Sequence, residues 1–170
     1  MAGMVHVYTG NGKGKTTSAI GLAVRAVGAG LDVFIGQFVK GMEYSELNSL
    51  ADIEGITVEQ YGQNYFIKGQ PNKKDIESAD YGLKKIKNIL DSGKYDLVIL
   101  DEANIATYYD LFKVDDLIDI IENRAKNVEV VITGRMANNK IIEYADLVTE
   151  MKEIKHYYQK GIIAREGIEK

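Results

Sequence analysis

The chain has 170 residues, 45% of them hydrophobic and 27% charged, with one proline and no cysteine. This profile is typical of a globular protein and predicts a single domain spanning residues 1–170. A formal net charge of −4 gives no reason to expect a nucleic-acid-binding surface, and the lack of cysteine excludes disulfides and thiolate chemistry. Because no signal sequence and no segment of about 20 apolar residues is seen, we expect a cytoplasmic protein without membrane contact.

Short β-branched runs alternate with segments of helical periodicity along the chain. The predicted strands are Met4–Tyr8, Val33–Val39, Thr57–Tyr61, Leu97–Leu100, Val128–Ile132 and Leu147–Thr149. The predicted helices are Lys15–Ala29, Glu43–Ala51, Lys73–Ser92, Val114–Ala125 and Asn138–Tyr144. This alternation predicts a three-layer α/β fold in which helices cover a mainly parallel central sheet.

The first predicted strand runs into a glycine-rich turn and then into the first predicted helix, with the sequence Thr9-Gly10-Asn11-Gly12-Lys13-Gly14-Lys15-Thr16-Thr17. Such a phosphate loop lets backbone N–H groups surround a polyphosphate, and the helix N-terminus adds a positive dipole end. Lys15 is placed to reach the outer phosphates and the Thr16 hydroxyl to bind Mg²⁺. The loop is shortened, because Thr9 stands where the first glycine of the usual spacing is expected.

A second motif consists of the apolar run Leu97–Leu100 followed by Asp101 and Glu102. A strand of this kind lies near a phosphate loop and places its terminal acid beside Mg²⁺. Each motif alone occurs in unrelated proteins, but their order and separation together predict nucleotide binding and a P-loop NTPase-like (RecA-like) domain. ATP is favoured over GTP, because Asn139-Lys140-Ile141-Ile142 lacks the aspartate of a guanine-binding motif. From these motifs alone, Glu102 is a candidate general base.

A series of short motifs covers nearly the whole chain: Gly10–Thr17, Gln37–Gly41, Leu100–Glu102, Thr133–Arg135, Ala145–Met151, Lys155–His156, Gly161–Ala164 and Gly167–Glu169. In this order they resemble the P-loop family of ATP:corrinoid (cob(I)alamin) adenosyltransferases, in which a shortened loop is normal. The resemblance implies that a Co(I) corrinoid attacks C5′ of ATP, so that a Co–C bond forms and triphosphate leaves.

The resemblance also implies ligands and residue roles, with ATP and a corrinoid as substrates and Mg²⁺ as cofactor. The triphosphate-binding residues would be Gly10, Asn11, Gly12, Lys13, Gly14, Lys15, Thr16 and Thr17. Lys15 would neutralise the leaving triphosphate, and Thr16, Asp101 and Glu102 would hold Mg²⁺. Because Co(I) has no proton to lose, Glu102 is better explained as a catalytic metal ligand than as a base.

For several residues the sequence is consistent with two different roles. The resemblance places Arg25 near the nucleotide, but a solvated position on an amphipathic helix is equally consistent. Arg135 follows a strand, where it either faces the ligand or forms a structural ion pair. Gln37 and Lys40 follow the second strand, and turn or surface roles compete with ligand roles. For His156 we favour a structural role with a hydrogen bond to the backbone over metal or cobalt ligation.

The region Gly62–Lys74 has little periodicity and is predicted to be the longest loop, where substrate contacts are expected. Relatives often carry a Phe-x-Trp element here whose aromatic rings help to close the corrinoid pocket. This chain has no tryptophan and offers Tyr65 and Phe66 instead. We expect these two rings to bind the corrinoid, and the alternative is that they are ordinary exposed loop residues.

Three functions compete at this stage. The resemblance favours a corrinoid adenosyltransferase over a small P-loop ATPase or kinase that forms ADP and phosphate, and over a non-catalytic nucleotide-binding module. It further implies a homodimer and a flavoprotein as the source of electrons.

Overall fold

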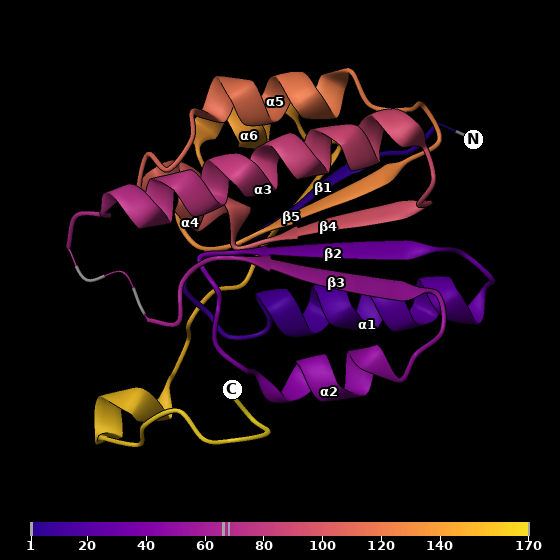
Figure 1. Cartoon of the computed structure of the whole chain (residues 1–170). Helices are drawn as coiled ribbons and strands as arrows, with labels where there is room; N and C mark the ends of the chain where they lie inside the picture. Colours follow the sequence, from indigo (N-terminus) through magenta and orange to yellow (C-terminus); the bar gives the residue numbers. More distant parts are fainter. Residues whose placement is uncertain (1, 66, 68, 170) are drawn as a thin grey trace.

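The computed structural model describes residues 2–65, 67 and 69–169. Its centre is a six-stranded sheet in the order β3-β2-β4-β5-β1-β6, in which every pair of neighbours is parallel (Figure 1). The strands are β1 (Val5–Thr9), β2 (Val33–Phe38), β3 (Ile56–Tyr61), β4 (Leu97–Asp101), β5 (Glu129–Thr133) and β6 (Leu147–Glu150). Because all strands run in the same direction, their carboxyl ends meet at one edge, where ligand sites are built in sheets of this type.

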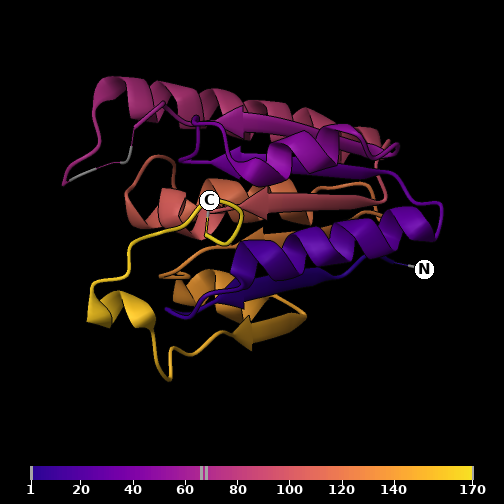
Figure 2. The same ribbon diagram turned by 90° about the horizontal axis from the view of Figure 1, so that it is seen from below.

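Helices cover both faces of this sheet. They are α1 (Lys15–Gly28), α2 (Ser45–Ala51), α3 (Lys73–Ser92), α4 (Ala103–Tyr108), α5 (Val114–Glu122) and α6 (Asn139–Tyr144), with a 3₁₀ turn at Tyr157–Lys160. Helices α1 and α2 lie on one face, and α3 to α6 lie on the other (Figure 1). The view from below shows α1 and α2 in front of the sheet, with the segment after β6 near the N-terminal end of α1 (Figure 2). The predicted three-layer α/β fold with a parallel sheet is therefore confirmed.

Each face has its own apolar core. The first cluster lies between the sheet and α3 to α6, and it includes Phe34, Phe38, Ile86, Leu100 and Ile132. The second lies under α1 and α2, where small alanines of α1 allow that helix to approach the sheet closely. Alternate residues of the central strands point into one core and then the other, which explains why these strands are apolar on both faces.

The longest predicted helix is confirmed at both ends. Helix α3 begins with a capping box, in which the Asn72 side chain accepts from the backbone of Asp75 and the Asp75 carboxylate accepts from the backbone of Asn72. It ends at Gly93, which has a positive φ of 61°. Other ends differ by one to three residues from the prediction: β5 begins at Glu129 instead of Val128, and α5 ends at Glu122 instead of Ala125.

Two elements were not predicted, the short helix α4 and the 3₁₀ turn. Helix α4 has six residues, which is less than two turns, so it leaves no helical period in the sequence. None of the helices in the described ranges is long and apolar enough to cross a membrane.

Candidate nucleotide site

The phosphate loop connects the carboxyl end of β1 to the first turn of α1, and Lys15 closes it. Lys15 is only 7% exposed. Its ammonium group donates hydrogen bonds to the carbonyl oxygens of Gly10 at 2.8 Å and Gly12 at 2.7 Å. Burial lowers the pKa of Lys15 and nearby Arg135 lowers it further, while the Glu102 and Asp101 carboxylates act in the opposite direction. The charge of Lys15 is therefore held inside the loop, where an anionic ligand is expected to bind.

The glycines of the loop serve two different purposes. Gly14 caps α1 with a φ of 118°, a conformation that favours glycine. Gly10, which also has a positive φ of 95°, and Gly12 make room for another segment, because a Cβ atom on either would lie 2.5 or 2.6 Å from the carbonyl oxygen of Met151. The Gly12 N–H donates a 2.6 Å hydrogen bond to that oxygen, and the Met151 N–H donates to Thr9. The segment after β6 thus holds the outer side of the phosphate loop, a role of Met151 that the sequence analysis missed.

Asp101 is the centre of the polar network at the end of β4. It is 1% exposed. Its Oδ1 accepts from the hydroxyls of Thr16 at 2.8 Å and Thr133 at 2.6 Å. Its Oδ2 accepts from Gln37 at 3.2 Å and from the Lys40 ammonium at 2.8 Å. The network joins β4 to α1, to β5 and to the end of β2, so the two predicted motifs lie together although β5 separates their strands in the sheet.

Glu102 lies directly beyond this network. Its backbone is left-handed, with a φ of 59°, and its N–H donates to the Thr133 hydroxyl at 3.1 Å. Burial raises the pKa of Glu102 and the Asp101 charge raises it further, while Lys40, Lys15 and Arg135 act in the opposite direction. The Glu102 side chain is therefore half-buried and lies close enough to Lys40, Lys15 and Arg135 for their charges to affect its pKa.

Gly134 gives the Glu102 carboxylate its space. A Cβ atom on Gly134 would lie 3.2 Å from Glu102 Oε2 and 3.0 Å from the Cβ atom of Asn104. Asn104, which is fully buried in α4, donates a 3.2 Å hydrogen bond to the Gly134 carbonyl. Asn104 is a further residue of this site that the sequence analysis missed, since no pattern marks α4.

The oxygen atoms at this site fit a hard divalent cation. The Thr16 hydroxyl donates its hydrogen bond to Asp101, so the lone pairs of the Thr16 oxygen remain free to coordinate a cation. Glu102 adds a carboxylate ligand. No group of three or more His, Cys, Asp or Glu side chains suited to a metal ion is found in the described part of the chain. Mg²⁺ often binds through one or two protein ligands together with substrate phosphates, so Thr16 and Glu102 are the residues that would hold it.

The other predicted site residues are placed as follows. Gln37 and Lys40 both bind Asp101, which favours a role in this network over a surface role. Arg135 is exposed and lies close enough to Lys15 to affect its pKa. Arg25 lies in the last turn of α1, ten residues and about 15 Å along the axis from Lys15, so its contact with the nucleotide stays a prediction. His156 accepts from the Tyr158 N–H at 3.1 Å, which confirms the predicted hydrogen bond to the backbone.

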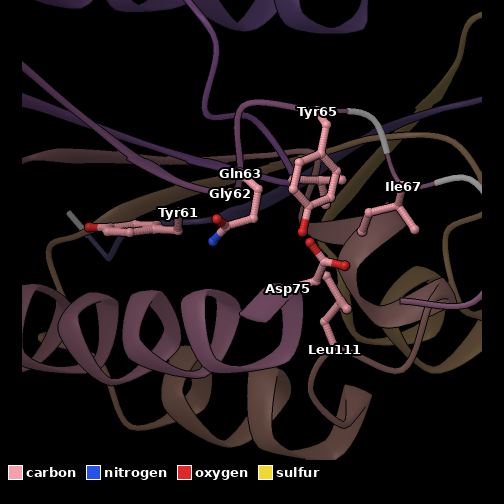
Figure 3. Close-up of a pocket in the computed structure, with 8 residues that line it drawn as sticks. Tyr61, Gly62, Gln63, Tyr65, Ile67, Asp75 and Leu111 are labelled. Atoms are coloured by element: carbon pink, nitrogen blue, oxygen red, sulfur yellow. The ribbon is translucent and has the colours of Figure 1, made fainter. Parts of the chain in front are cut away.

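A pocket lies beside the network, below the loop that follows β3. Its lining residues are Val39, Tyr61, Gly62, Gln63, Tyr65, Ile67, Asp75 and Leu111. Tyr65 and Ile67 extend from the loop toward Asp75 and Leu111 (Figure 3). The Tyr65 hydroxyl accepts a 2.7 Å hydrogen bond from Asn72, the residue that caps α3. The predicted partner of Tyr65, Phe66, lies outside the described residues.

Proteins in which a phosphate loop opens α1 and acidic residues end a neighbouring parallel strand form the class of P-loop nucleotide-binding proteins, and this chain has both features. The sequence model of one family in this class, described as "ATP:corrinoid adenosyltransferase BtuR/CobO/CobP", matches residues 1–169. The chain belongs to this family.

Individual proteins of known name are also similar to this chain over almost its whole length. A corrinoid adenosyltransferase of Escherichia coli K12 is 33% identical over 167 residues, which cover 98% of this chain and 85% of that protein. The corrinoid adenosyltransferase of Pseudomonas aeruginosa is 36% identical over 169 residues, covering 98% and 83%. A third, from Sinorhizobium, is 35% identical over 171 residues, covering 98% and 80%.

Proposed function

We propose that this chain transfers the 5′-deoxyadenosyl group of ATP to a Co(I) corrinoid and releases triphosphate. The observation that carries the proposal is the shortened phosphate loop, joined through Thr16 to Asp101, in a chain that belongs to the ATP:corrinoid adenosyltransferase family. Within one domain, this loop would bind the triphosphate of ATP, and the loop that carries Tyr65 would contact the corrinoid.

The reaction balances without a proton transfer. The electron pair of Co(I) forms the Co–C5′ bond, the C5′–O bond breaks, and its electron pair leaves on the triphosphate. Negative charge therefore gathers at the 5′ oxygen in the transition state, and the Lys15 ammonium and loop N–H groups would stabilise it. Mg²⁺, when bound to Thr16 and Glu102, supplies further positive charge at the phosphate oxygens. Holding the two substrates in line can contribute roughly 7–11 kcal/mol.

A small P-loop ATPase or kinase is the alternative function. That reaction needs a residue that positions water or deprotonates an acceptor hydroxyl. Burial and the Asp101 charge raise the pKa of Glu102, so this carboxylate by itself does not distinguish the two reactions. What favours adenosyl transfer over the alternative is that the chain belongs to the adenosyltransferase family.

Three further features complete the proposal. Strand β6 is an edge strand whose four residues are all exposed, including the apolar Leu147 and Val148, and such an edge supports assembly into a homodimer. A flavoprotein would supply the electron that forms Co(I). The cytoplasm would be the place of the reaction.

The direct test is a dark, anaerobic incubation of the protein with Mg-ATP and chemically reduced cob(I)alamin, with the visible spectrum and triphosphate measured together. We expect a photolabile adenosylated corrinoid that forms in equal amount with triphosphate. Formation of ADP and phosphate with an unchanged corrinoid spectrum would move the chain to the ATPases or kinases. Tight ATP binding without turnover, with every corrinoid offered, would make it a non-catalytic module.

Replacing Tyr65 with alanine is expected to slow the reaction that starts from Co(II) more than the reaction that starts from supplied Co(I). The reason is that an apolar pocket around the corrinoid is needed to make Co(II) reducible, whereas Co(I) is already the nucleophile. Initial rates should be measured from both starting states, with a reductant present in the first. Tyr65→Phe is the matched control, since it keeps the ring and removes only the hydrogen bond from Asn72. Equal loss from both starting states would contradict the role of this ring.

A further inference from the structure

The turn between β2 and α2 has a strained backbone and carries Lys40. Val39 has a φ of 60°, a left-handed conformation that is rare for a β-branched residue. Strain of this kind persists only where surrounding contacts hold it, and it gathers at functional sites. The turn therefore holds the next residue, Lys40, in a fixed position.

The Lys40 side chain is turned inward, with 13% of its surface exposed. Its ammonium lies 2.8 Å from Asp101 Oδ2 and 3.6 Å from Glu46 Oε1, and it also lies 4.9 Å from the centre of the Tyr44 ring. Both carboxylates lie within ion-pair distance of the ammonium, so Lys40 is a cation held in a fixed position inside the site.

This cation completes the hydrogen bonding of Asp101. A carboxylate has about four lone-pair positions, and Asp101 accepts from four side chains: Thr16, Thr133, Gln37 and Lys40. Gln37 is itself held by Gln60, whose amide donates to Gln37 Oε1 at 3.1 Å. Protein donors occupy all of these positions in this structure, whereas the sequence analysis named Asp101 among the residues that would hold Mg²⁺.

The other side of the same turn faces the loop that follows β3. A Cβ atom on Gly62 would lie 2.4 Å from the backbone nitrogen of Lys40, and one on Gly41 would lie 2.6 Å from the backbone of Gly62 and Gln63. Val39 lines the pocket with Tyr65. The turn is therefore packed backbone to backbone against the loop that precedes Tyr65, which keeps Lys40 from moving away from Asp101.

We propose that Lys40 is a positioning residue: its ammonium serves as an internal cation that keeps Mg²⁺ from binding Asp101 directly, so that Asp101 orients Thr16 and the metal is left to Thr16 and Glu102. The inference rests on the proposed function only for the identity of the nucleotide. A merely structural ion pair would stabilise the fold but would not keep divalent ions away from Asp101.

The test measures Mn²⁺ binding without nucleotide, by the loss of the free Mn²⁺ signal in electron paramagnetic resonance. Removing the charge in Lys40→Gln leaves Asp101 and Glu102 as two adjacent acids without that cation, and we expect Mn²⁺ to bind about tenfold more tightly. Lys40→Met should behave in the same way, whereas Lys40→Arg should resemble the unchanged protein. The surface pair of Lys85 and Glu59, at 2.6 Å, provides the control Lys85→Gln, which should leave Mn²⁺ affinity unchanged.

Two further measurements make the test decisive. Thermal unfolding identifies which Lys40 variants are folded, and Lys40→Gln keeps a hydrogen-bond donor so that Asp101 retains a partner. Adding Asp101→Asn to Lys40→Gln should abolish the extra Mn²⁺ binding. Unchanged or weaker Mn²⁺ binding by folded Lys40→Gln, or extra binding that survives Asp101→Asn, would overturn the proposal. Because nucleotide and corrinoid are absent, the result is independent of whether adenosyl transfer occurs.

Discussion

Replacing Lys15 with alanine is expected to lower the rate of adenosyl transfer by at least about 10²–10³-fold, the usual effect of removing one group that stabilises a developing negative charge. Triphosphate leaves as a whole, so charge gathers at the phosphate oxygens near the loop as the C5′–O bond breaks. The Lys15 ammonium already lies within this loop, bound to the carbonyls of Gly10 and Gly12. Its loss should therefore act mainly on kcat rather than on ATP binding.

The measurement is kcat and KM for ATP with chemically supplied Co(I), together with thermal unfolding of the same variant. Unfolding matters because Lys15→Ala also removes two hydrogen bonds within the loop. Lys87→Ala is the control, since Lys87 lies on α3, is half exposed and pairs only with Asp91 among the described residues. Near-normal turnover by a folded Lys15→Ala protein would refute the role given to this lysine.

Replacing Gly12 with alanine is expected to destabilise the protein by about 2–4 kcal/mol and to abolish ATP binding, because overpacking and a lost hydrogen bond add together. The added methyl group would lie 2.6 Å from the Met151 carbonyl oxygen and 3.0 Å from the Lys152 backbone. Backbone atoms cannot turn aside as a flexible side chain does. Either the segment after β6 or the phosphate loop must therefore move, and the hydrogen bond from Gly12 to Met151 is lost.

Gly21 provides the matched control for this substitution. It lies within α1, and a Cβ atom there meets no other atom within 4 Å. Gly21→Ala should stabilise the protein by about 0.5–1 kcal/mol, because alanine loses less backbone entropy in a helix. The two variants are compared by denaturant unfolding and by calorimetric titration with ATP. If Gly12→Ala were as stable as Gly21→Ala and bound ATP normally, the contact with Met151 would have no part in shaping the loop.

Much of the fold was accessible from local patterns. Each core strand is a short β-branched run, and α3 combines an amphipathic period with a capping box and a terminal glycine. Those signals arise within a few neighbouring residues, so they can be recognised in the sequence before the fold is known. Helix α4 shows the limit, because it has only six residues, four of them buried against β2, β5 and the first core, and it carries no period of its own.

The residues of the candidate site likewise fall into those that the sequence predicts and those that it does not. The phosphate loop and the paired acids after β4 were found because each is a continuous motif. The sequence analysis assigned both Asp101 and Glu102 to Mg²⁺, since both are acids in adjacent positions. Their surroundings differ: Asp101 accepts from four side chains, while Glu102 lies in the space left by Gly134. Neither set of neighbours is near these two residues in the sequence.

Glycine spacing, strand polarity and motif order are properties of contiguous residues, so the class of fold, the shortened phosphate loop and the family could all be predicted from the sequence. What the loop glycines face and which cation pairs with Asp101 depend on the tertiary structure. Met151 is 139 residues from Gly12 in the chain, and Lys40 is 61 residues from Asp101. They meet because parallel strands bring all their carboxyl ends to one edge of the sheet, where groups remote in sequence share one small, buried and polar space.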